Sequence, residues 1–228
     1  INSLKGRMAI GHVRYSADGE QDVLNAQPLV SRYIKGPLAV ATNGTLTNYH
    51  ELKHQLEQEG AIFQTTNETE IIMHLLARAR MKTGRVETGL AEIMKTQLRG
   101  AYALVMMSPQ KLIACRDPKG MKPLCMGKIE NSYVFASETC ALDTVRAEFV
   151  RELDPGEIVI IDVNGVRSIR DNCQDRKCSG MCVFEYLYFA RSDSIIEGMS
   201  VHKARKLTRK ILSETYPVDA DIVAAEPD

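Results

Sequence analysis

The 228-residue sequence has no net charge, because 29 lysines and arginines balance 29 aspartates and glutamates. The chain therefore has no excess charge to attract nucleic acid or an acidic membrane surface. No apolar run approaches the ~20 residues that span a bilayer, and no signal-peptide pattern opens the chain. These absences predict a soluble, cytoplasmic protein that binds neither nucleic acid nor membranes.

The first half of the chain contains no cysteine. The first of the six cysteines is Cys115. None of the six forms a C-x-x-C pair, and a chain of this length can bury a sizeable core without disulfides. We therefore expect reduced thiols. Cys173, Cys178 and Cys182 follow one another at irregular gaps, which is a weak signal for a metal site.

The two ends of the sequence suggest that more chain flanks it. The first residue is Ile1 rather than methionine, and the sequence stops at Asp228, just after an apolar run at 222–225 that is typical of a strand. We expect a piece of a longer polypeptide.

The period of the apolar residues changes along the chain. Runs at 7–13 and 37–42 predict two short strands, and helical spacing then predicts helices at about 48–59, 67–79 and 86–98. Further strands are expected at 101–107, 112–115, 124–126, 133–136, 157–162 and 166–169, with a short helix at 138–145. This order predicts an α+β fold of stacked sheets flanked by helices, rather than a parallel βαβ repeat.

The C-terminal fifth of the chain has a different character. Residues 171–181 are polar and are typical of a linker, and 182–190 are strand-like. A helix capped by Ser200 is expected to run to about Glu214, with the basic stretch 203–210 on its solvated face. This tail resembles the beginning of a second, α/β domain.

Two short stretches carry groups suited to a small charged ligand. Arg14, in the sequence GHVRYS at 11–16, offers a planar fork of donors that matches a carboxylate. Asn43 offers an amide N–H and Gly44 a backbone N–H without a side chain in the way, as in an oxyanion hole. The alternative is a surface arginine and an ordinary Asn-Gly turn.

The two stretches belong to a longer ordered set. The set is GHVRYS at 11–16, NAQPL at 25–29, NGTLTN at 43–48, TTNETE at 65–70 and CVFEYLYFARSDS at 182–194. Together these motifs resemble the glutamine phosphoribosylpyrophosphate amidotransferases, or amidophosphoribosyltransferases, over nearly the whole chain. These are class II glutamine amidotransferases of the N-terminal-nucleophile hydrolase type.

The resemblance implies a fold and a division into domains. Residues 1–170 would form a glutamine amidotransferase (glutaminase) domain that lacks its N-terminal segment, with the four-layer αββα sandwich of the N-terminal-nucleophile hydrolases. Residues 171–181 would be a linker, and 182–228 would begin an α/β phosphoribosyltransferase domain. The full protein would be a cytoplasmic homo-oligomer, usually a homotetramer in this family.

The resemblance also implies an activity, that of a pentosyltransferase with glutamine amidotransferase activity in the first step of de novo purine biosynthesis. Glutamine hydrolysis would supply ammonia to phosphoribosyl pyrophosphate, giving phosphoribosylamine, glutamate and pyrophosphate. An N-terminal cysteine is the nucleophile in this family. Arg14 would bind the α-carboxylate of glutamine, Asn43 and Gly44 would form the oxyanion hole, and Glu68 would hold the α-ammonium group.

Two cofactors follow from the same resemblance. Mg²⁺ would accompany phosphoribosyl pyrophosphate in the part of the protein beyond this chain. Some family members carry a [4Fe-4S] cluster whose ligands include a cysteine just before the FEY motif, which here is Cys182. The other ligands would also lie beyond this chain.

The sequence departs from the family pattern in four respects. No cysteine stands near the start of the chain, Ala17 replaces a threonine that helps to hold the substrate, and Glu68 replaces an aspartate. Ser192 stands where FARPDS would have proline. Because the nucleophile is missing, we expect the chain by itself to be inactive.

Two other identities remain open on the sequence. One is the glutaminase half of another class II amidotransferase, such as one that makes glucosamine 6-phosphate or asparagine. The other is a catalytically dead paralogue that binds glutamine or a partner and regulates, which Ala17 and Glu68 would support. His12 is expected to be structural, and Asp117 to make a turn between strands.

Overall fold

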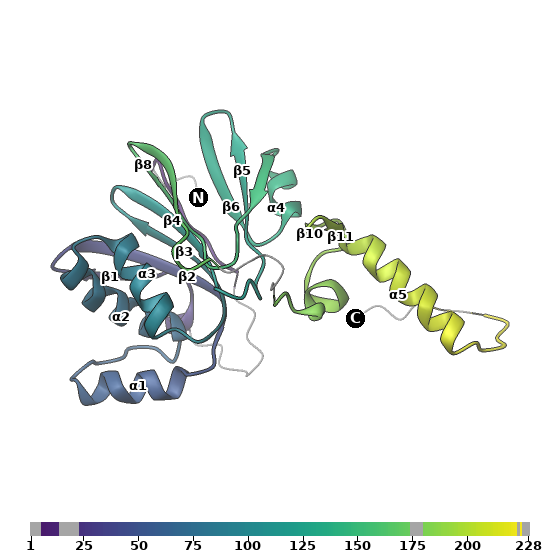
Figure 1. Cartoon of the computed structure of the whole chain (residues 1–228), viewed down its shortest axis with the longest axis horizontal. Helices are drawn as coiled ribbons and strands as arrows, with labels where there is room; N and C mark the ends of the chain where they lie inside the picture. The colour runs from purple at the N-terminus through teal and green to yellow at the C-terminus, as the bar shows by residue number, and fades with distance from the viewer. Residues whose placement is uncertain (1–5, 14–22, 174–179, 223, 225–228) are drawn as a thin grey trace.

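The computed structural model describes residues 6–13, 23–173, 180–222 and 224. Its largest element is a six-stranded antiparallel sheet in the order β1-β2-β3-β4-β8-β9 (Figure 1). The strands are β1 (Leu29–Tyr33), β2 (Gly36–Leu46), β3 (Gly100–Ser108), β4 (Lys111–Arg116), β8 (Ile158–Asp162) and β9 (Gly165–Ile169). All pairs are antiparallel, as the sequence predicted.

A second, three-stranded antiparallel sheet has the order β6-β5-β7. Its strands are β5 (Cys125–Ile129), β6 (Ser132–Ala136) and β7 (Glu148–Glu152). Four helices accompany the two sheets: α1 (Tyr49–Gln58), α2 (Glu68–Thr83), α3 (Val86–Thr96) and α4 (Thr139–Thr144). In Figure 1, α1, α2 and α3 lie on one side of the molecule and α4 on the other.

The alternation of side chains along β3 explains the layers. Leu104 and Met106 point into a core shared with α2 and α3, whereas Ala103 points into a smaller core between the two sheets. A third cluster joins Cys125 of β5 to Leu142 of α4. The order of layers is helices, sheet, sheet, helix, which confirms the predicted αββα sandwich.

Helix α2 forms where the apolar spacing predicted it. Its buried stripe includes Ile71, Ile72, Leu75 and Leu76, and it packs on the six-stranded sheet. The side chain of Asn67 accepts a hydrogen bond from the Thr69 N–H at 2.9 Å and so caps the start of the helix.

Helix α1 begins where the sequence predicted, but its first residues are not held by a side-chain cap. Asn48 is the N-cap residue, but its side chain makes no cap hydrogen bond. Its amide instead donates to the Gln97 carbonyl at 2.8 Å and accepts from the Arg99 N–H at 3.2 Å. Asn48 therefore ties the start of α1 to the approach to β3.

The strand predicted at 7–13 is wrong, because the described part of this stretch has no regular structure. At Thr42 of β2, the backbone N–H and carbonyl bond to side chains instead of to a further strand. The Thr42 N–H donates to Gln27 Oε1 at 2.6 Å, and the Thr42 carbonyl accepts from His12 Nε2 at 3.1 Å. The expected structural role of His12 is consistent with this bond.

The strand-like segment at 182–190 is also a wrong prediction, since it contains a π-helical turn at Glu185–Phe189. Three of its carbonyls, those of Tyr186, Tyr188 and Ala190, accept hydrogen bonds from the Arg205 guanidinium. These carbonyls therefore bond to the guanidinium of Arg205 instead of to the N–H groups of a neighbouring strand. The expected strand at 222–225 and the middle of the expected linker, 174–179, lie outside the described residues.

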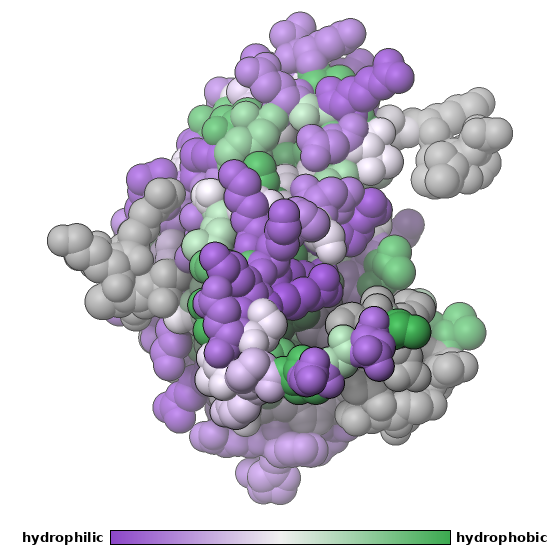
Figure 2. All heavy atoms as spheres, turned by 90° about the vertical axis from the view of Figure 1, so that its right-hand side faces the viewer, coloured by the Kyte–Doolittle hydropathy of each residue, from purple (hydrophilic) through white to green (hydrophobic). Residues whose placement is uncertain are grey.

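The chain ends in a two-stranded ribbon and a long helix. They are β10 (Ile195–Ile196), β11 (Met199–Ser200) and α5 (Val201–Thr215), and α5 extends away from the sheets (Figure 1). The Ser200 side chain caps α5 at the Lys203 N–H, as predicted. The face turned to the viewer in Figure 2 is mainly hydrophilic, in agreement with an exposed basic helix face.

The helices in the described part of the chain are too short, or too polar, to cross a membrane.

A buried carboxylate, that of Glu157, stabilises the six-stranded sheet at the start of β8. Glu157 is fully buried just before β8, and both of its oxygens pair with the Arg151 guanidinium, at 2.6 and 2.7 Å. Burial alone would raise the pKa of Glu157, but the bonds from Arg151, Ser168 and the Asp154 N–H outweigh it and lower the pKa from 4.5 to about 2.

This depressed pKa predicts a pH dependence of stability. The contribution of the Glu157 carboxylate is complete above about pH 4.5 and is lost as the pH falls towards 2. It amounts to about 3 kcal/mol at neutral pH. We expect the urea midpoint of the wild type to drop between pH 5 and pH 2, and that of Glu157→Gln to start lower and to drop less. Replacing the exposed Glu148 with glutamine is the control. Parallel curves for wild type and E157Q would contradict the assignment.

Candidate active site

Asn43 and Gly44 lie inside β2, not in a turn after it. Asn43 is paired with Ala103 of β3 and Gly44 with Tyr102, and the strand continues to Leu46. The prediction that this strand ends at the Asn-Gly pair, and the alternative that the pair is an ordinary turn, are therefore both wrong.

Gly44 is required by the backbone at this point. Its φ is +134°, and a Cβ atom there would lie 2.0 Å from the Ala101 carbonyl oxygen. Gly100, across the ladder from Leu46, has a φ of +142°, and its Cβ would lie 2.2 Å from the Thr45 carbonyl oxygen. The two glycines let the backbones of β2 and β3 approach more closely than side chains would allow.

The side chain of Asn43 faces the three-stranded sheet. Its neighbour Thr42 bonds to Thr69 of α2 on the opposite face, and successive residues of a strand point to opposite sides. Asn43 Nδ2 donates to Ser137 Oγ at 3.4 Å, and Ser137 lies between β6 and α4. Asn43 is half-buried and Ser137 is exposed. The amide therefore lies at an accessible edge of the space between the sheets.

Glu68 reaches the same end of β2 from the first turn of α2. Its Oε2 atom accepts a hydrogen bond from the Leu46 N–H at 2.6 Å, two residues beyond Gly44. The start of a helix favours a carboxylate. The structure thus brings together three of the four residues that the sequence singled out for glutamine binding. Arg14, the fourth, lies outside the described residues, as does Ala17.

The turn that carries Glu68 is held by residues to which the sequence analysis assigned no part in the site. Asn25 bonds to Thr66 through both of its side-chain atoms, at 2.9 and 3.1 Å, and its carbonyl accepts from Asn67 Nδ2 at 2.9 Å. The carboxylate of Glu70 accepts from the N–H groups of Gln64 and Thr65. Asn25 belongs to the NAQPL motif and Glu70 to the TTNETE motif. Membership of these motifs was the only feature of the sequence that could have pointed to their role in holding the turn.

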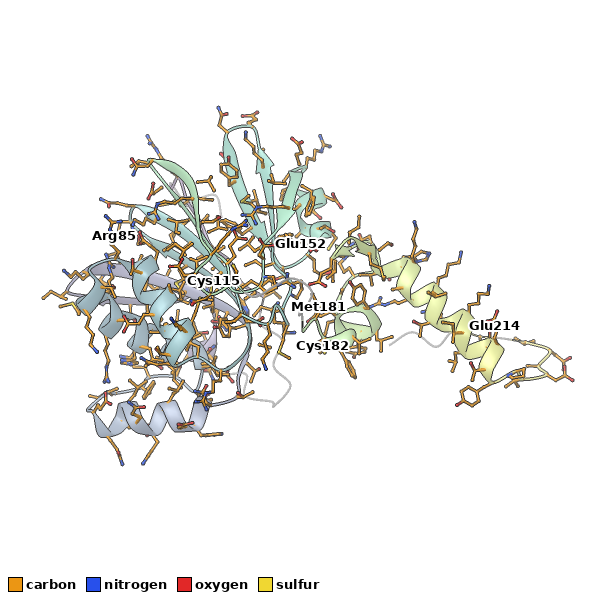
Figure 3. The ribbon with its side chains drawn as sticks, in the orientation of Figure 1. Arg85, Cys115, Glu152, Met181, Cys182 and Glu214 are labelled. Carbon is orange, nitrogen blue, oxygen red and sulfur yellow. The ribbon has the colours of Figure 1, made fainter. Side chains whose placement is uncertain are left out.

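Three of the cysteines with described structure, Cys115, Cys125 and Cys173, lack the features of a reactive nucleophile. Cys115 is fully buried in the body of the sandwich (Figure 3), and burial, with the nearby Asp117 carboxylate, raises the pKa of its thiol. Burial likewise raises the pKa of Cys125 to about 12 and that of Cys173 to about 11. A raised pKa keeps a thiol protonated and unreactive at neutral pH.

Cys182, the iron–sulfur candidate, is half-buried beside Met181, where the C-terminal segment leaves the sandwich (Figure 3). Within the described ranges, no three histidine, cysteine, aspartate or glutamate side chains gather closely enough to hold a metal ion. A single thiol does not make a cluster site, so these residues alone do not fit the cofactor.

Asp117 has the structural role that the sequence predicted. It is fully buried, and its carboxylate accepts hydrogen bonds from the N–H groups of Lys119, Met121 and Lys122. These bonds shape the connection between β4 and β5.

The sequence profile of the glutamine amidotransferase domain matches residues 12–144, more than half of the chain. The chain belongs to the glutamine amidotransferase domain family. The match spans Asn43, Gly44 and Glu68, so the candidate site lies within the glutamine amidotransferase domain.

Three curated relatives of this glutamine amidotransferase domain are amidophosphoribosyltransferases. The one from Archaeoglobus fulgidus is 43% identical and is matched over 99% of this chain and 49% of its own length. Those from Methanocaldococcus jannaschii and Bacillus subtilis are 43% and 42% identical over all of this chain, covering 51% and 47% of their lengths. The chain therefore spans about half the length of the relatives it matches.

Two solved structures resemble the glutamine amidotransferase domain closely. One is the glutamine phosphoribosylpyrophosphate amidotransferase of B. subtilis complexed with ADP and GMP, with a TM-score of 0.81 and 41% identity. The other is described as the allosteric regulatory enzyme of purine biosynthesis, with a TM-score of 0.83 and 41% identity. Each match covers 92% of this chain and 44% of the other. The resemblance inferred from the motifs, and the sandwich fold, are confirmed.

The backbone geometry at Gly44 predicts a large effect of a single methyl group. Gly44→Ala would place Cβ against the Ala101 carbonyl and force a positive φ on alanine, so we expect a loss of at least about 3 kcal/mol in unfolding free energy. Urea denaturation measures it. The control is Gly11→Ala, whose Cβ would meet nothing within 4 Å, and which should change stability by less than ~0.5 kcal/mol. A G44A variant as stable as the wild type would contradict the close approach of the strands.

Proposed function

We propose that this chain is the glutamine-hydrolysing part of an amidophosphoribosyltransferase. The observation that carries the proposal is the meeting of Asn43, Gly44 and Glu68 at one end of β2, in a chain related over its whole length to amidophosphoribosyltransferases. The parent protein would transfer ammonia from glutamine to phosphoribosyl pyrophosphate, giving phosphoribosylamine, glutamate and pyrophosphate. This is the first step of de novo purine synthesis.

Each of the candidate residues has a chemical task in this proposal. Arg14 pairs with the α-carboxylate of glutamine and Glu68 with its α-ammonium group, so the amino acid is held at its charged end. A thiolate then adds to the side-chain amide carbon, and the Asn43 amide and the Gly44 N–H stabilise the negative charge that forms on the carbonyl oxygen. Collapse of this intermediate breaks the C–N bond, and the leaving nitrogen takes up a proton to depart as ammonia. Water then hydrolyses the thioester that remains, which releases glutamate and restores the thiol.

The nucleophile itself is not supplied by this chain. No cysteine precedes Cys115 in the sequence, and Cys115 is buried with a raised pKa. In the proposal, an N-terminal cysteine of the complete polypeptide provides the thiolate and its own α-amino group acts as the base. The chain by itself should therefore bind glutamine without releasing ammonia.

The second half-reaction belongs to the phosphoribosyltransferase part. Residues 182–228 are proposed to begin that domain, after a linker at 171–181. Mg²⁺ would be bound together with phosphoribosyl pyrophosphate there. A [4Fe-4S] cluster that includes Cys182, a homotetramer and a cytoplasmic location remain predictions from the resemblance.

The alternative of a catalytically dead paralogue is also tested, because two particular residues support it. Ala17 removes a substrate-holding hydroxyl, and Glu68 is longer by one methylene than the aspartate of the family. A complete polypeptide that binds glutamine in calorimetry but never releases ammonia would support this alternative.

Asn43→Ala in the complete polypeptide provides the main test. Because one donor to the oxyanion is removed, we expect glutamine-dependent kcat to fall about 10²- to 10³-fold. Release of ammonia and formation of glutamate are the measurements. Activity with added ammonium chloride in place of glutamine should stay at the wild-type level, because it bypasses the glutaminase site.

Arg14→Ala should instead abolish glutamine binding. Full glutamine-dependent activity in either variant would contradict the proposed site. So would ammonia release by the isolated chain at a rate that Arg14→Ala abolishes.

A charge-only change at Glu68 tests the substrate-binding role. Glu68→Gln retains an acceptor for the Leu46 N–H but removes the negative charge, so we expect the glutamine KM to rise about tenfold with little change in kcat. The matched control is Glu51→Gln, at an exposed carboxylate of α1. A KM that stays unchanged in E68Q would show that Glu68 only fixes the backbone of β2.

A further inference from the structure

The loop between β6 and α4 joins the candidate site to the C-terminal segment. Ser137 touches Asn43 on one side, and the next residue, Glu138, contacts the FARSDS motif on the other. Glu138 Oε2 accepts from the Arg191 N–H at 2.8 Å and from the Ser194 hydroxyl at 2.7 Å. Thr139 Oγ1 accepts from the Ile195 N–H at 2.8 Å. Three directional bonds thus fix 191–195 against 138–139.

The partner of Glu138 is itself tightly held. Ser194 is fully buried, and its carbonyl accepts from the Val201 N–H at 3.0 Å. Arg205 of α5 donates to the carbonyl of Ala190 at 2.8 Å and to Ser192 Oγ at 3.0 Å. The FARSDS motif is therefore clamped between α5 and the β6–α4 loop. Because the motif is held in this way, the groups that Glu138 bonds to have fixed positions.

An amide at an oxyanion hole needs such an anchor. The terminal torsion of asparagine is broad and roughly two-fold, so an unrestrained amide presents either its N–H groups or its carbonyl oxygen to the substrate. The carbonyl would repel an oxyanion. When one N–H is bonded to Ser137 Oγ, as here at 3.4 Å, the planar amide holds its second N–H in a defined direction.

We propose that Ser137 is a positioning residue for Asn43, and that Glu138 keeps Ser137 in place by holding the FARSDS motif. This inference rests on the proposed glutaminase function. Neither residue touches the substrate. Their effect is on the orientation of the amide when charge develops on the substrate oxygen, because misplacement of a group by ~1 Å in a site is costly.

The first test is Ser137→Ala in the complete polypeptide. Because the amide is released but still present, we expect glutamine-dependent kcat to fall roughly tenfold, less than for Asn43→Ala, with KM within about twofold of the wild type. Ser137→Thr keeps the hydroxyl and should retain most of the activity. The control is Ser132→Ala, at the exposed far end of the same strand, β6.

A second readout separates positioning from folding. The semialdehyde analogue of glutamate accepts the thiol at its aldehyde carbon, while the thiol proton passes to the oxygen, so its adduct resembles the tetrahedral intermediate. In Ser137→Ala, affinity for this analogue should fall roughly tenfold while affinity for glutamate stays the same. An unchanged melting temperature and unchanged ammonia-dependent activity are expected. Equal losses for both ligands would overturn the positioning role.

The link to Glu138 is tested by a double-mutant cycle. Glu138→Ala alone should lower glutamine-dependent kcat several-fold, and Glu138→Gln, which keeps an acceptor oxygen, should lower it less. The pair Ser137→Ala/Glu138→Ala should be no worse than Ser137→Ala alone, because residues that act as one unit are not additive. Fully multiplicative effects would overturn the link.

The proposed function and the positioning role of Ser137 can fail separately. A complete wild-type polypeptide without glutamine-dependent ammonia release overturns the proposed function and this inference together. An active wild type, an impaired Asn43→Ala and a normal Ser137→Ala overturn the inference alone.

Discussion

The close approach of β2 and β3 determines the geometry of the candidate site. At Gly44 and Gly100 the two backbones lie where a Cβ atom would overlap a carbonyl of the facing strand. The pairing also fixes the alternation of β2, so Asn43 must point between the sheets. The Leu46 N–H of the same strand meets the carboxylate of Glu68. One stretch of four residues thus positions both the proposed oxyanion donors and the carboxylate proposed to bind the ammonium group.

Side chains, rather than further strands, attach the remaining motifs to this stretch. The N–H and carbonyl of Thr42 bond to Gln27 and His12, which come from two different motifs. Asn25, near Gln27, holds the turn that precedes Glu68. Buried backbone groups without partners are costly, so each of these contacts also stabilises the fold. This explains how motifs far apart in the sequence meet at one end of β2.

The sequence predicted the parts of the fold that depend on local pattern. The buried stripe of α2 and the hairpin of β8 and β9 follow from periodicity and turn chemistry, and both were found. Strand β1 was missed because its side chains are mostly exposed at the edge of the sheet. The π-helical turn at Glu185–Phe189 was missed because its carbonyls bond to Arg205, which lies twenty residues after Glu185 in the sequence. The position of Asn43 within a strand likewise depends on Gly100, which no local pattern around Asn43 contains.

The contact between the sandwich and the C-terminal segment is polar, and this decides what it can do. Besides the bonds of Glu138, it contains the ion pairs Lys122–Glu185, at 2.6 Å, and Arg116–Glu197, at 3.1 Å. Partly buried pairs of this kind contribute little net stability, since desolvation offsets much of their attraction. They do require particular directions and distances. A contact of this kind fixes the register of the C-terminal segment against the β6–α4 loop, which also carries Ser137, the hydrogen-bond partner of Asn43.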